Sequence, residues 1–375
     1  MCVSGALIEA GPPHHPTTEG DTNTSASRCP EHWVEPQFTK AAKVRVAITA
    51  VFFLLAVCSN TAVLGSLLRK RRKCHVRPLI LSLVLADLLV TVAVMPLDAA
   101  WNVTVQWYGG DLSCKLLNFL KLFAMYAAAL VLVVISLDRH AAILQPFARA
   151  RRRNGLLLRA AWMGSVLLAL PQLFLFHLHT VPGGNFTQCV THGSFRAQWE
   201  ETVYNMFTFT TLYITPLSIM IVCYARIIWE ISKQLKINKS LVRSQRDHIS
   251  KARMKTLKMT IVIVATFIVC WTPYYLLGLW YWFQPAMIQR MPEYINHSFF
   301  LFGLLHTCTD PIIYGLYTPS FREDVQLCLR GIEAAITRHE KHKPILVSEK
   351  TTKDGAVNGR VASGGSNGTT INTVC

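Results

Sequence analysis

Several ionisable side chains lie inside long apolar stretches of this chain, and six of them are candidates for function. A charged side chain at the centre of a bilayer costs at least about 2.5 kcal/mol, so it usually serves ion pairing, binding or switching. Asp138 and Arg139 lie near the end of their stretch, where a side chain can reach water, but Asp87 and Asp310 lie in the middle of theirs. The six residues considered are Asp87, Asp98, Lys121, Asp138, Arg139 and Asp310. Recognition and switching within a membrane are the chemistry that these residues favour.

A second pattern lies near the end of one stretch. Asp98, Trp101 and Asn102 are spaced i, i+3, i+4 and therefore share one face of a helix. Lys121 follows Cys114 by about two helical turns. We expect Asp98 and Lys121 to form an ion pair, because pairing compensates the cost of burying both charges. The pair either belongs to a ligand site or is purely structural, and the residues alone leave both interpretations open.

Catalytic chemistry finds no support in the sequence. No nucleophile with a neighbouring base and no group of metal ligands is evident. His177, His179 and His192 are spaced irregularly, unlike the ligands of a zinc site. We therefore expect no enzyme activity, no cofactor and no resident metal ion of that kind.

Seven apolar stretches must position these residues. A run of about 20 apolar residues crosses a bilayer as a helix, and a helix satisfies its backbone polar groups internally. Neither internal repeats nor broken helices typical of transporters are evident. The sequence therefore predicts an all-α membrane protein, a seven-transmembrane helix bundle, with helices at 44–68, 78–101, 114–143, 156–178, 203–228, 257–283 and 294–317.

The formal net charge of +17 is concentrated in alternate loops. Lys and Arg are dense in residues 69–77, 149–153 and 231–256, whereas only Arg196 and Arg290 stand out in the other loops. This placement follows the positive-inside rule and argues against a nucleic-acid partner. We expect a multi-pass protein of the plasma membrane with an extracellular N-terminus and a cytoplasmic C-terminus. Its basic loops would contact anionic lipid.

Four segments follow from this topology. We expect an extracellular N-terminal segment at 1–43, the transmembrane domain at 44–317, a short amphipathic eighth helix at 318–331 and a disordered cytoplasmic tail at 332–375. Cys328 is a candidate for palmitoylation. Asn23 and Asn185 begin glycosylation sequons on the expected outer side.

Four of the 11 cysteines fall on the expected outer side, namely Cys2, Cys29, Cys114 and Cys189. Cys114 opens the third stretch, and Cys189 lies in the middle of the loop between the fourth and the fifth. We expect a disulfide between them, which would pin this loop over the mouth of the bundle. Whether Cys2 pairs with Cys29 stays open.

Short motifs occur in order on all seven stretches. They are Asn60, Leu85-Ala86-Asp87, Asp138-Arg139-His140, Trp162, Pro216, Cys270-Trp271-Thr272-Pro273 and Asp310-Pro311-Ile312-Ile313-Tyr314. Together these motifs resemble the rhodopsin family of G-protein-coupled receptors over residues 44–331. A retinylidene protein would need a Schiff-base lysine in its last helix, and residues 294–317 contain none.

Longer stretches resemble the gonadotropin-releasing hormone receptors within that family. They cover residues 95–98, 101–108, 120–123, 188–192, 255–260 and 270–283. The resemblance implies a cell-surface receptor for an amidated decapeptide hormone. Receptors for related neuropeptides, of the adipokinetic, corazonin or vasopressin/oxytocin type, share the framework and are the alternative.

The resemblance also implies a ligand-binding set near the outer end of the bundle. Asn102 would bond to the C-terminal amide of the peptide, and Asp98 and Lys121 would engage its N-terminal part. Tyr281 would meet its central tyrosine. Trp101 and Asn205 complete this set.

Glu293 would attract an arginine of the hormone. Its setting, Pro292-Glu293-Tyr294, resembles the non-mammalian members of the family rather than the mammalian type I receptors, so acceptance of the type II hormone is expected. An exposed ion pair contributes about 1 kcal/mol or less. Glu293 should therefore tune selectivity rather than create affinity.

The resemblance also implies an activation switch in the sixth stretch, residues 257–283. Trp271 would pack below the ligand, and Pro273 removes a backbone hydrogen bond, so the helix can kink and swing outward at its far end. Many relatives lock the arginine of helix three with an acid at the base of helix six, where this chain has Arg253. Asp138 is then the remaining partner for Arg139. Tyr224 and Tyr314 complete the implied switch.

Asp87 and Asp310 belong to helices that touch at this depth in the family. Two bare carboxylates in a medium of low dielectric constant would repel each other. We therefore expect the pair to hold a proton or a cation such as sodium.

The implied partners are a Gq-class heterotrimeric G protein, acting through phospholipase C and calcium release, and arrestin and receptor kinases, acting through the tail. His306 and Thr307 stand where the family resemblance leads us to expect Asn-Pro or Asn-Thr. No function for these two residues follows from the sequence.

Overall fold

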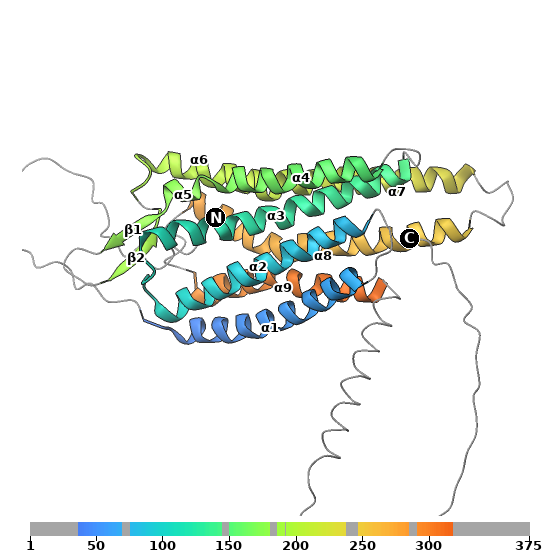
Figure 1. The fold of residues 1–375 in the computed structure, drawn as a ribbon. Coiled ribbons are helices and arrows are strands. Elements are labelled where there is room, and N and C mark those ends of the chain that lie inside the picture. The colour runs from blue at the N-terminus through green and yellow to red at the C-terminus, as the bar shows by residue number, and fades with distance from the viewer. Residues whose placement is uncertain are drawn as a thin grey trace, which may run out of the picture.

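The computed structural model describes residues 37–69, 76–144, 150–180, 186–191, 193–237, 247–284 and 291–317, and every structural statement below concerns these residues. Seven helical spans within them are long and apolar enough to cross a membrane, and they run side by side (Figure 1). The predicted bundle is confirmed. The proposed eighth helix, Asn23, Asn185, Cys328 and the tail lie outside the described residues.

The long helices have the following bounds. They are α1 (Lys40–Arg69), α2 (Arg77–Thr104), α3 (Gly110–Leu144), α4 (Ala150–Ala169), α6 (Gln198–Phe209), α7 (Thr215–Ile237), α8 (Asp247–Phe283) and α9 (Glu293–Tyr317). A π-helical turn, η2 (Thr210–Ile214), joins α6 to α7 within one span. Each predicted stretch lies inside one of these spans, except the fourth.

The fourth stretch was predicted as one helix to residue 178, but the helix is interrupted after Ala169 and the span ends at Leu175. Pro171 has no backbone N–H to continue the helix, so α4 ends just before it. One further turn, α5 (Gln172–Leu175), leads into strand β1 (His177–Thr180). This strand pairs antiparallel with β2 (Thr187–Val190), and His177 lies opposite Val190. The resulting hairpin covers one end of the bundle, called the hairpin end below (Figure 1).

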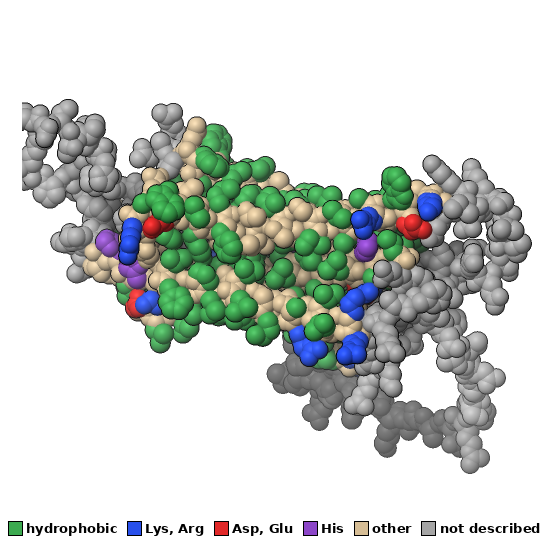
Figure 2. Space-filling view, turned by 90° about the horizontal axis from the view of Figure 1, so that it is seen from above, with side chains coloured by type: hydrophobic (Ala, Val, Ile, Leu, Met, Phe, Trp, Pro, Cys, Tyr) green, Lys and Arg blue, Asp and Glu red, His purple; other side chains and the backbone are tan. Residues whose placement is uncertain are grey.

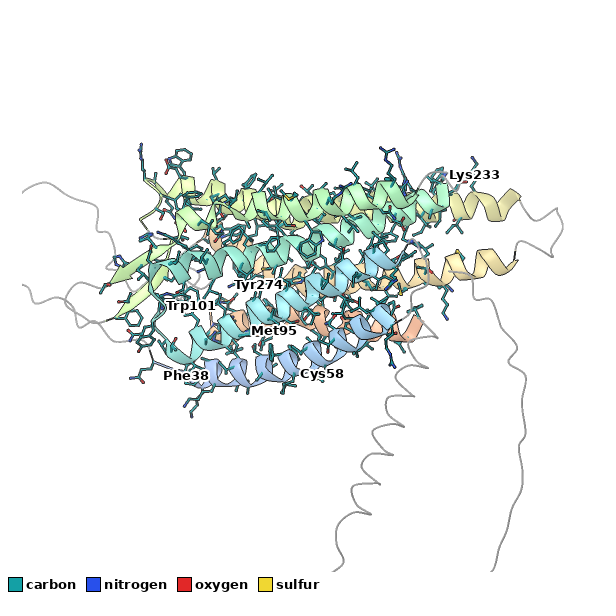
Figure 3. The ribbon with its side chains drawn as sticks, viewed as in Figure 1. Phe38, Cys58, Met95, Trp101, Lys233 and Tyr274 are labelled. Carbon is teal, nitrogen blue, oxygen red and sulfur yellow. A yellow bond between two sulfur atoms is a disulfide. The ribbon has the colours of Figure 1, made fainter. Side chains whose placement is uncertain are left out.

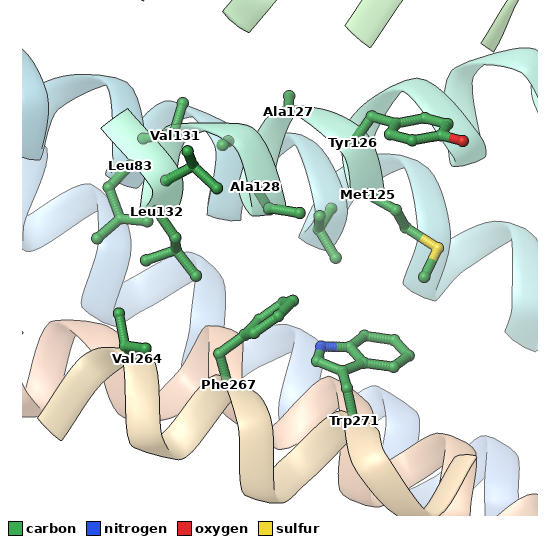
Figure 4. Close-up of a cluster of buried hydrophobic side chains, with 14 of the residues drawn as sticks. Leu83, Met125, Tyr126, Ala127, Ala128, Val131, Leu132, Val264, Phe267 and Trp271 are labelled. Atoms are coloured by element: carbon green, nitrogen blue, oxygen red, sulfur yellow. The ribbon is translucent and has the colours of Figure 1, made fainter. Parts of the chain in front are cut away.

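The surface and the core both fit a membrane protein. Hydrophobic side chains cover the middle of the surface, and charged side chains gather near its two ends (Figure 2). Leu54, Val92 and Leu167 are among the large apolar residues exposed there. Inside, Tyr126 and Leu132 of α3 pack in the same cluster as Phe267 of α8 (Figure 4). Helix α3 is therefore the centre of the core.

Hydroxyl side chains within the helices bond to their own backbone. Ser136 Oγ donates to the Leu132 carbonyl at 2.9 Å, and Ser165 Oγ donates to the Ala161 carbonyl at 2.8 Å. Such bonds satisfy polar atoms where no water is present. Hydroxyl-bearing residues can thus lie at membrane depth without belonging to a binding site. Charged residues at this depth are therefore the stronger indication of a functional site.

Candidate functional site

Asp98 is buried in α2 near the hairpin end, and its partner comes from α1. Arg45 donates from Nε to Asp98 Oδ2 at 2.9 Å, and its Nη2 contacts Oδ1. This fork-to-fork geometry satisfies both carboxylate oxygens at once. Lys121 Nζ lies instead 5.9 Å from the centre of the Phe300 ring. The sequence predicted Lys121 as the partner of Asp98, whereas Arg45 holds both of its carboxylate oxygens.

The Arg45 guanidinium extends the pair to α9. Its Nη1 lies 2.6 Å from His297 Nδ1, and His297 Nε2 lies 2.9 Å from Glu293 Oε1. Because a guanidinium only donates, Nδ1 must accept, and the ring proton sits on Nε2 and points to Glu293. Thr39 Oγ1 donates to the same Glu293 oxygen at 3.0 Å. This rim network, made of Thr39, Arg45, Asp98, Glu293 and His297, ties three parts of the bundle together.

Aromatic rings connect the rim network to the middle of the bundle. The Arg45 guanidinium lies 4.5 Å from the centre of the Phe300 ring, so two cations share this ring. Phe300 contacts Tyr274 with ring centres 5.6 Å apart, and Tyr274 contacts Trp271 at 5.8 Å. The cations at Phe300 are therefore connected to Trp271 by two direct contacts between aromatic rings.

Trp101 holds the hairpin to α2. Its indole N–H donates to Gln188 Oε1 at 2.8 Å, and Gln188 Nε2 donates to the Val105 carbonyl at 2.8 Å. Val105 adopts a φ of 61°, which is unusual for a β-branched residue and is stabilised by these contacts. Trp107 packs against Trp101 with ring centres 5.0 Å apart. Trp101 is buried, so it shapes the mouth by fixing the loop; Figure 3 places it at the hairpin end.

The predicted disulfide between Cys114 and Cys189 is confirmed. It joins the start of α3 to β2, and Asn118 Nδ2 lies 3.2 Å from Cys189 Sγ. The same amide donates to the Cys114 carbonyl at 2.9 Å. The hairpin is thus fixed to both α2 and α3.

The remaining predicted ligand residues lie on three elements. Asn102 is half-buried, and its amide donates to the Asp98 carbonyl at 2.7 Å. Asn205 is buried in α6, and Tyr281 is half-buried in α8, a helix that contacts α6. The structure joins Asp98 to Glu293 through the rim network and sets Lys121 at its edge. Asn205 and Tyr281 belong to a different pair of helices.

Trp271 lies deep in α8, two residues before Pro273. Its indole N–H lies 3.0 Å from His306 Nδ1 of α9, and Gly303 provides the surface against which the ring packs. Met125, Ala128 and Phe267 surround it in the view of Figure 4. Trp271, which the sequence analysis assigned to the switch, therefore has a fixed position against α9.

Asp87 and Asp310 line one small cavity between α2 and α9, together with Asn60 and Tyr314. Among the described residues, neither carboxylate has a hydrogen-bond partner, and Asn60 Oδ1 has none either. Asn60 Nδ2 donates to the Thr307 carbonyl at 3.0 Å, which holds α1 against α9. The atoms of these three side chains that lack a partner among the described residues are all oxygens, a set that suits a proton or a small hard cation.

At the opposite end of the bundle, Asp138 pairs with Arg139 as predicted. Asn154 Nδ2 donates to Asp138 Oδ1 at 2.6 Å, and Arg153 Nη2 lies 3.8 Å from the same oxygen. Tyr224 of α7 is buried. The side chain of Arg253 lies outside the described residues. No group of three or more potential metal ligands occurs in the described part of the chain.

Sequence reasoning missed four residues of the site, namely Arg45, Gln188, His297 and Phe300. Arg45 lay inside the first predicted stretch, so the criterion that selected Asp98 would also have selected it. His297 follows Glu293 by four residues, a spacing that allows contact on one helix face. Gln188 and Phe300 carry no comparable signal, because an amide and a phenyl ring are ordinary at such positions.

Comparison with known proteins identifies the framework. The model of the "7 transmembrane receptor (rhodopsin family)" matches residues 59–314. A gonadotropin-releasing hormone II receptor of Clarias gariepinus is 56% identical over 339 residues, which cover 88% of this chain and 89% of that protein. The gonadotropin-releasing hormone II receptor of Callithrix jacchus is 48% identical, over 78% of this chain and 80% of that protein.

A third relative has a different name and is more distant. The gonadotropin-releasing hormone receptor of Rattus norvegicus is 44% identical over 76% of this chain and 91% of that protein. These proteins are receptors and not enzymes, in agreement with the sequence. This chain belongs to the rhodopsin family of seven-transmembrane receptors and, within it, to the gonadotropin-releasing hormone receptors.

Proposed function

We propose that this chain is a cell-surface receptor that binds gonadotropin-releasing hormone decapeptides and activates Gq-class G proteins, phospholipase C and calcium release. The observation that carries the proposal is the 56% identity to a type II hormone receptor over 88% of the chain. A peptide ligand and coupling to G proteins in general are properties of this receptor family.

The rim network supports a binding site for a peptide with polar ends. In the proposed complex, Asn102 bonds to the C-terminal amide of the hormone, and Asp98 and Lys121 engage its N-terminal part. Because Arg45 occupies both Asp98 oxygens, the hormone must share or displace these bonds. Tyr281 and Asn205 contact the hormone from α8 and α6. Trp101 acts through the loop that it holds.

Glu293 is proposed to read one position of the hormone. Both of its contacts among the described residues fall on Oε1, so Oε2 keeps its capacity to accept a bond from a hormone arginine. The side chain is 36% exposed, and an exposed pair contributes about 1 kcal/mol or less. Glu293 therefore adjusts the preference among hormone forms, and the type II form is accepted.

Activation is proposed to pass from this rim to the opposite end. The ring contacts from Phe300 to Trp271 support such a route, and Pro273 provides the hinge that swings α8 outward. Arg139, Tyr224 and Tyr314 then face the opening that receives the G protein. Asp87 and Asp310 hold a proton or a sodium ion between them.

The proposed setting is the plasma membrane, with the hairpin end outside. Asn23 and Asn185 carry glycans there, whereas the basic loops contact lipid inside. The tail recruits receptor kinases and arrestin, and Cys328 is a candidate palmitoyl anchor.

Calcium release in transfected cells tests the proposal. Cells expressing the chain are challenged with type I and type II hormone peptides, and we expect a saturable response to both. Untransfected cells and cells given a peptide of the adipokinetic type are the controls. Silence toward both hormones from protein present at the cell surface, or a stronger response to the adipokinetic peptide, would overturn the hormone assignment.

The same cells can test the role of Glu293. In Glu293→Gln, we expect the potency ratio between arginine-bearing and type II peptides to fall by up to about fivefold, since one exposed ion pair is lost. An unchanged ratio would refute this role while leaving the hormone assignment intact.

A further inference from the structure

His306 is almost completely buried at 2% exposure, although the sequence assigned it no function. Its ring lies between two aromatic side chains of α8. The ring centre is 5.7 Å from Trp271 and 5.6 Å from Phe267, with both neighbours turned edge to face. A polar ring in such a place must direct its two nitrogen atoms to specific partners.

Nδ1 of His306 has two neighbours that it cannot serve together. The Trp271 indole N–H lies 3.0 Å away and can only donate, whereas the Gly303 carbonyl lies 2.9 Å away and can only accept. If Nδ1 accepts from Trp271, the ring proton is on Nε2, which has no partner among the described residues. If Nδ1 carries the proton, it donates to Gly303, and Trp271 loses its acceptor.

The first arrangement leaves only the Nε2 hydrogen without a partner among the described residues, whereas the second leaves both the Trp271 indole N–H and Nε2 without one, so the first arrangement is favoured. Only the first arrangement holds the indole. The bond between His306 and Trp271 is therefore directional, and breaking it leaves the buried indole N–H without an acceptor.

The backbone of α9 fixes where this indole can lie. A Cβ atom at Gly303 would come within 2.7 Å of Trp271 Cε3 and 2.8 Å of Cζ3. The tryptophan thus packs directly on the α9 backbone and next to His306, with Pro273 two residues further along α8. Any outward movement of α8 that rotates this ring must first break the hydrogen bond to His306.

We propose that His306 is a positioning residue that holds Trp271 in the resting arrangement by accepting the indole hydrogen bond. Loss of this acceptor favours the outward arrangement of α8 and raises signalling without hormone. The inference goes beyond the proposed hormone recognition, because it needs only the G-protein coupling of the family.

The test measures nucleotide exchange without ligand in membranes that contain the full-length receptor and a panel of G proteins, per receptor at the cell surface. His306→Leu removes the acceptor, and we expect a rise of about three- to fivefold, the effect of one buried hydrogen bond between helices. His306→Asn places an amide oxygen near the position of Nδ1 and should restore exchange toward the wild-type value. Because no hormone is added, silence toward hormones would bear on the proposed function alone.

Two further variants separate positioning from general destabilisation. Thr307→Val is the matched control, since its hydroxyl bonds within α9 to the Leu304 carbonyl at 2.8 Å, and exchange should stay at the wild-type value. Trp271→Phe removes the donor, so His306→Leu should add nothing in that background.

The proposal is overturned if His306→Leu leaves exchange unchanged, or if it raises exchange equally in the Trp271→Phe background. Should His306→Leu fail to reach the surface, His306→Phe replaces it, because it keeps a ring against Phe267 and lacks an acceptor. Unchanged exchange in that variant would overturn the proposal in the same way.

Discussion

Two cations, Arg45 and Lys121, lie near the same Phe300 ring, and we propose different roles for them. Arg45 neutralises the buried Asp98 carboxylate, whereas Lys121 is proposed to meet the hormone. Removing one member of a buried ion pair costs about 3–5 kcal/mol, because the other charge is left without compensation. We therefore expect Arg45→Gln to lower the thermal unfolding midpoint of the purified receptor much more than Lys121→Gln does. Lys121→Gln should chiefly weaken hormone potency.

A double variant provides the control for this prediction. Arg45→Gln combined with Asp98→Asn removes both charges, so much of the lost stability should return. An unchanged unfolding midpoint in Arg45→Gln, or no recovery in the double variant, would mean that the Arg45–Asp98 pair does not stabilise the rim.

Gly303 lets the Trp271 ring pack directly against the backbone of α9. Gly303→Ala places a methyl group within 2.7 Å of the Trp271 ring, so the ring must move off α9. We expect a loss of about 1–3 kcal/mol in the free energy of unfolding, as for other overpacked sites. We also expect increased nucleotide exchange without hormone.

The matched control is Gly278→Ala in α8, which also faces a tryptophan. Its Cβ would lie 3.8 Å from Trp282 Cζ2, an ordinary contact, so stability and exchange should change little. Equal effects of the two variants would show that the close packing at Gly303 has no special role.

A residue of the site could be predicted when its own sequence context is unusual, and it could not when its role depends on contacts between helices. Asp98 and Asp310 could be selected from the sequence, because a charge in an apolar stretch is costly wherever the neighbouring helices lie. The partner of Asp98 could not, since it depends on which helix supplies a cation at that depth. Arg45 and Lys121 were both available, and only the arrangement of α1, α2 and α3 decides between them.

The irregular turns of the helices also make contacts that hold the bundle together. The π-helical turn η2 lies just before Pro216, whose ring would otherwise clash with the carbonyl of residue 212. Within this turn, Thr211 bonds to Tyr126 of α3 at 2.7 Å, and the Tyr213 hydroxyl bonds to Thr272 of α8. The widened turn therefore ties the fifth span to both neighbours, and on α8 it does so one residue before Pro273.

Tyr213→Phe should lower stability only slightly, and for a reason visible in the structure. The Thr272 hydroxyl donates to the Ile268 carbonyl at 2.5 Å, so it keeps a partner when the tyrosine hydroxyl is removed. Losing one hydrogen bond between membrane helices costs about 0.6–1 kcal/mol. Thermal unfolding of the purified receptor measures this loss. In a double-mutant cycle, Thr272→Val should add little to Tyr213→Phe at this contact, and full additivity would contradict a direct bond.

The elements themselves were predictable to different degrees. The long spans follow from the length and hydropathy of their sequences, so their existence and order could be predicted. The end of α4 was also signalled, by Pro171, but a continuous apolar run obscured it. Strand β1 could not be predicted, because its pairing with β2 depends on the Cys114–Cys189 disulfide and on Gln188, contacts that join distant parts of the chain.

The two ends of the molecule are chemically different. The hairpin end carries the disulfide, the rim network and the proposed ligand residues, whereas the other end carries the Asp138–Arg139 pair with Asn154. Figure 3 places Trp101 near the first end, Lys233 near the second and Tyr274 between them. The proposed function is therefore meaningful only if the hairpin end faces the outside of the cell.

Glycan mapping tests this orientation. The sequons at Asn23 and Asn185 belong to segments expected outside, and Asn185 falls between β1 and β2 in the chain. Those at Asn238 and Asn367 belong to the side where Lys and Arg are dense, which the positive-inside rule assigns to the cytosol. Glycans are added only on the luminal side, so Asn23→Gln and Asn185→Gln should each reduce the mass that a glycosidase removes. Asn238→Gln and Asn367→Gln, the matched controls, should leave it unchanged. A mass loss that depends on Asn238 would place the rim network in the cytosol, where no extracellular hormone could reach it.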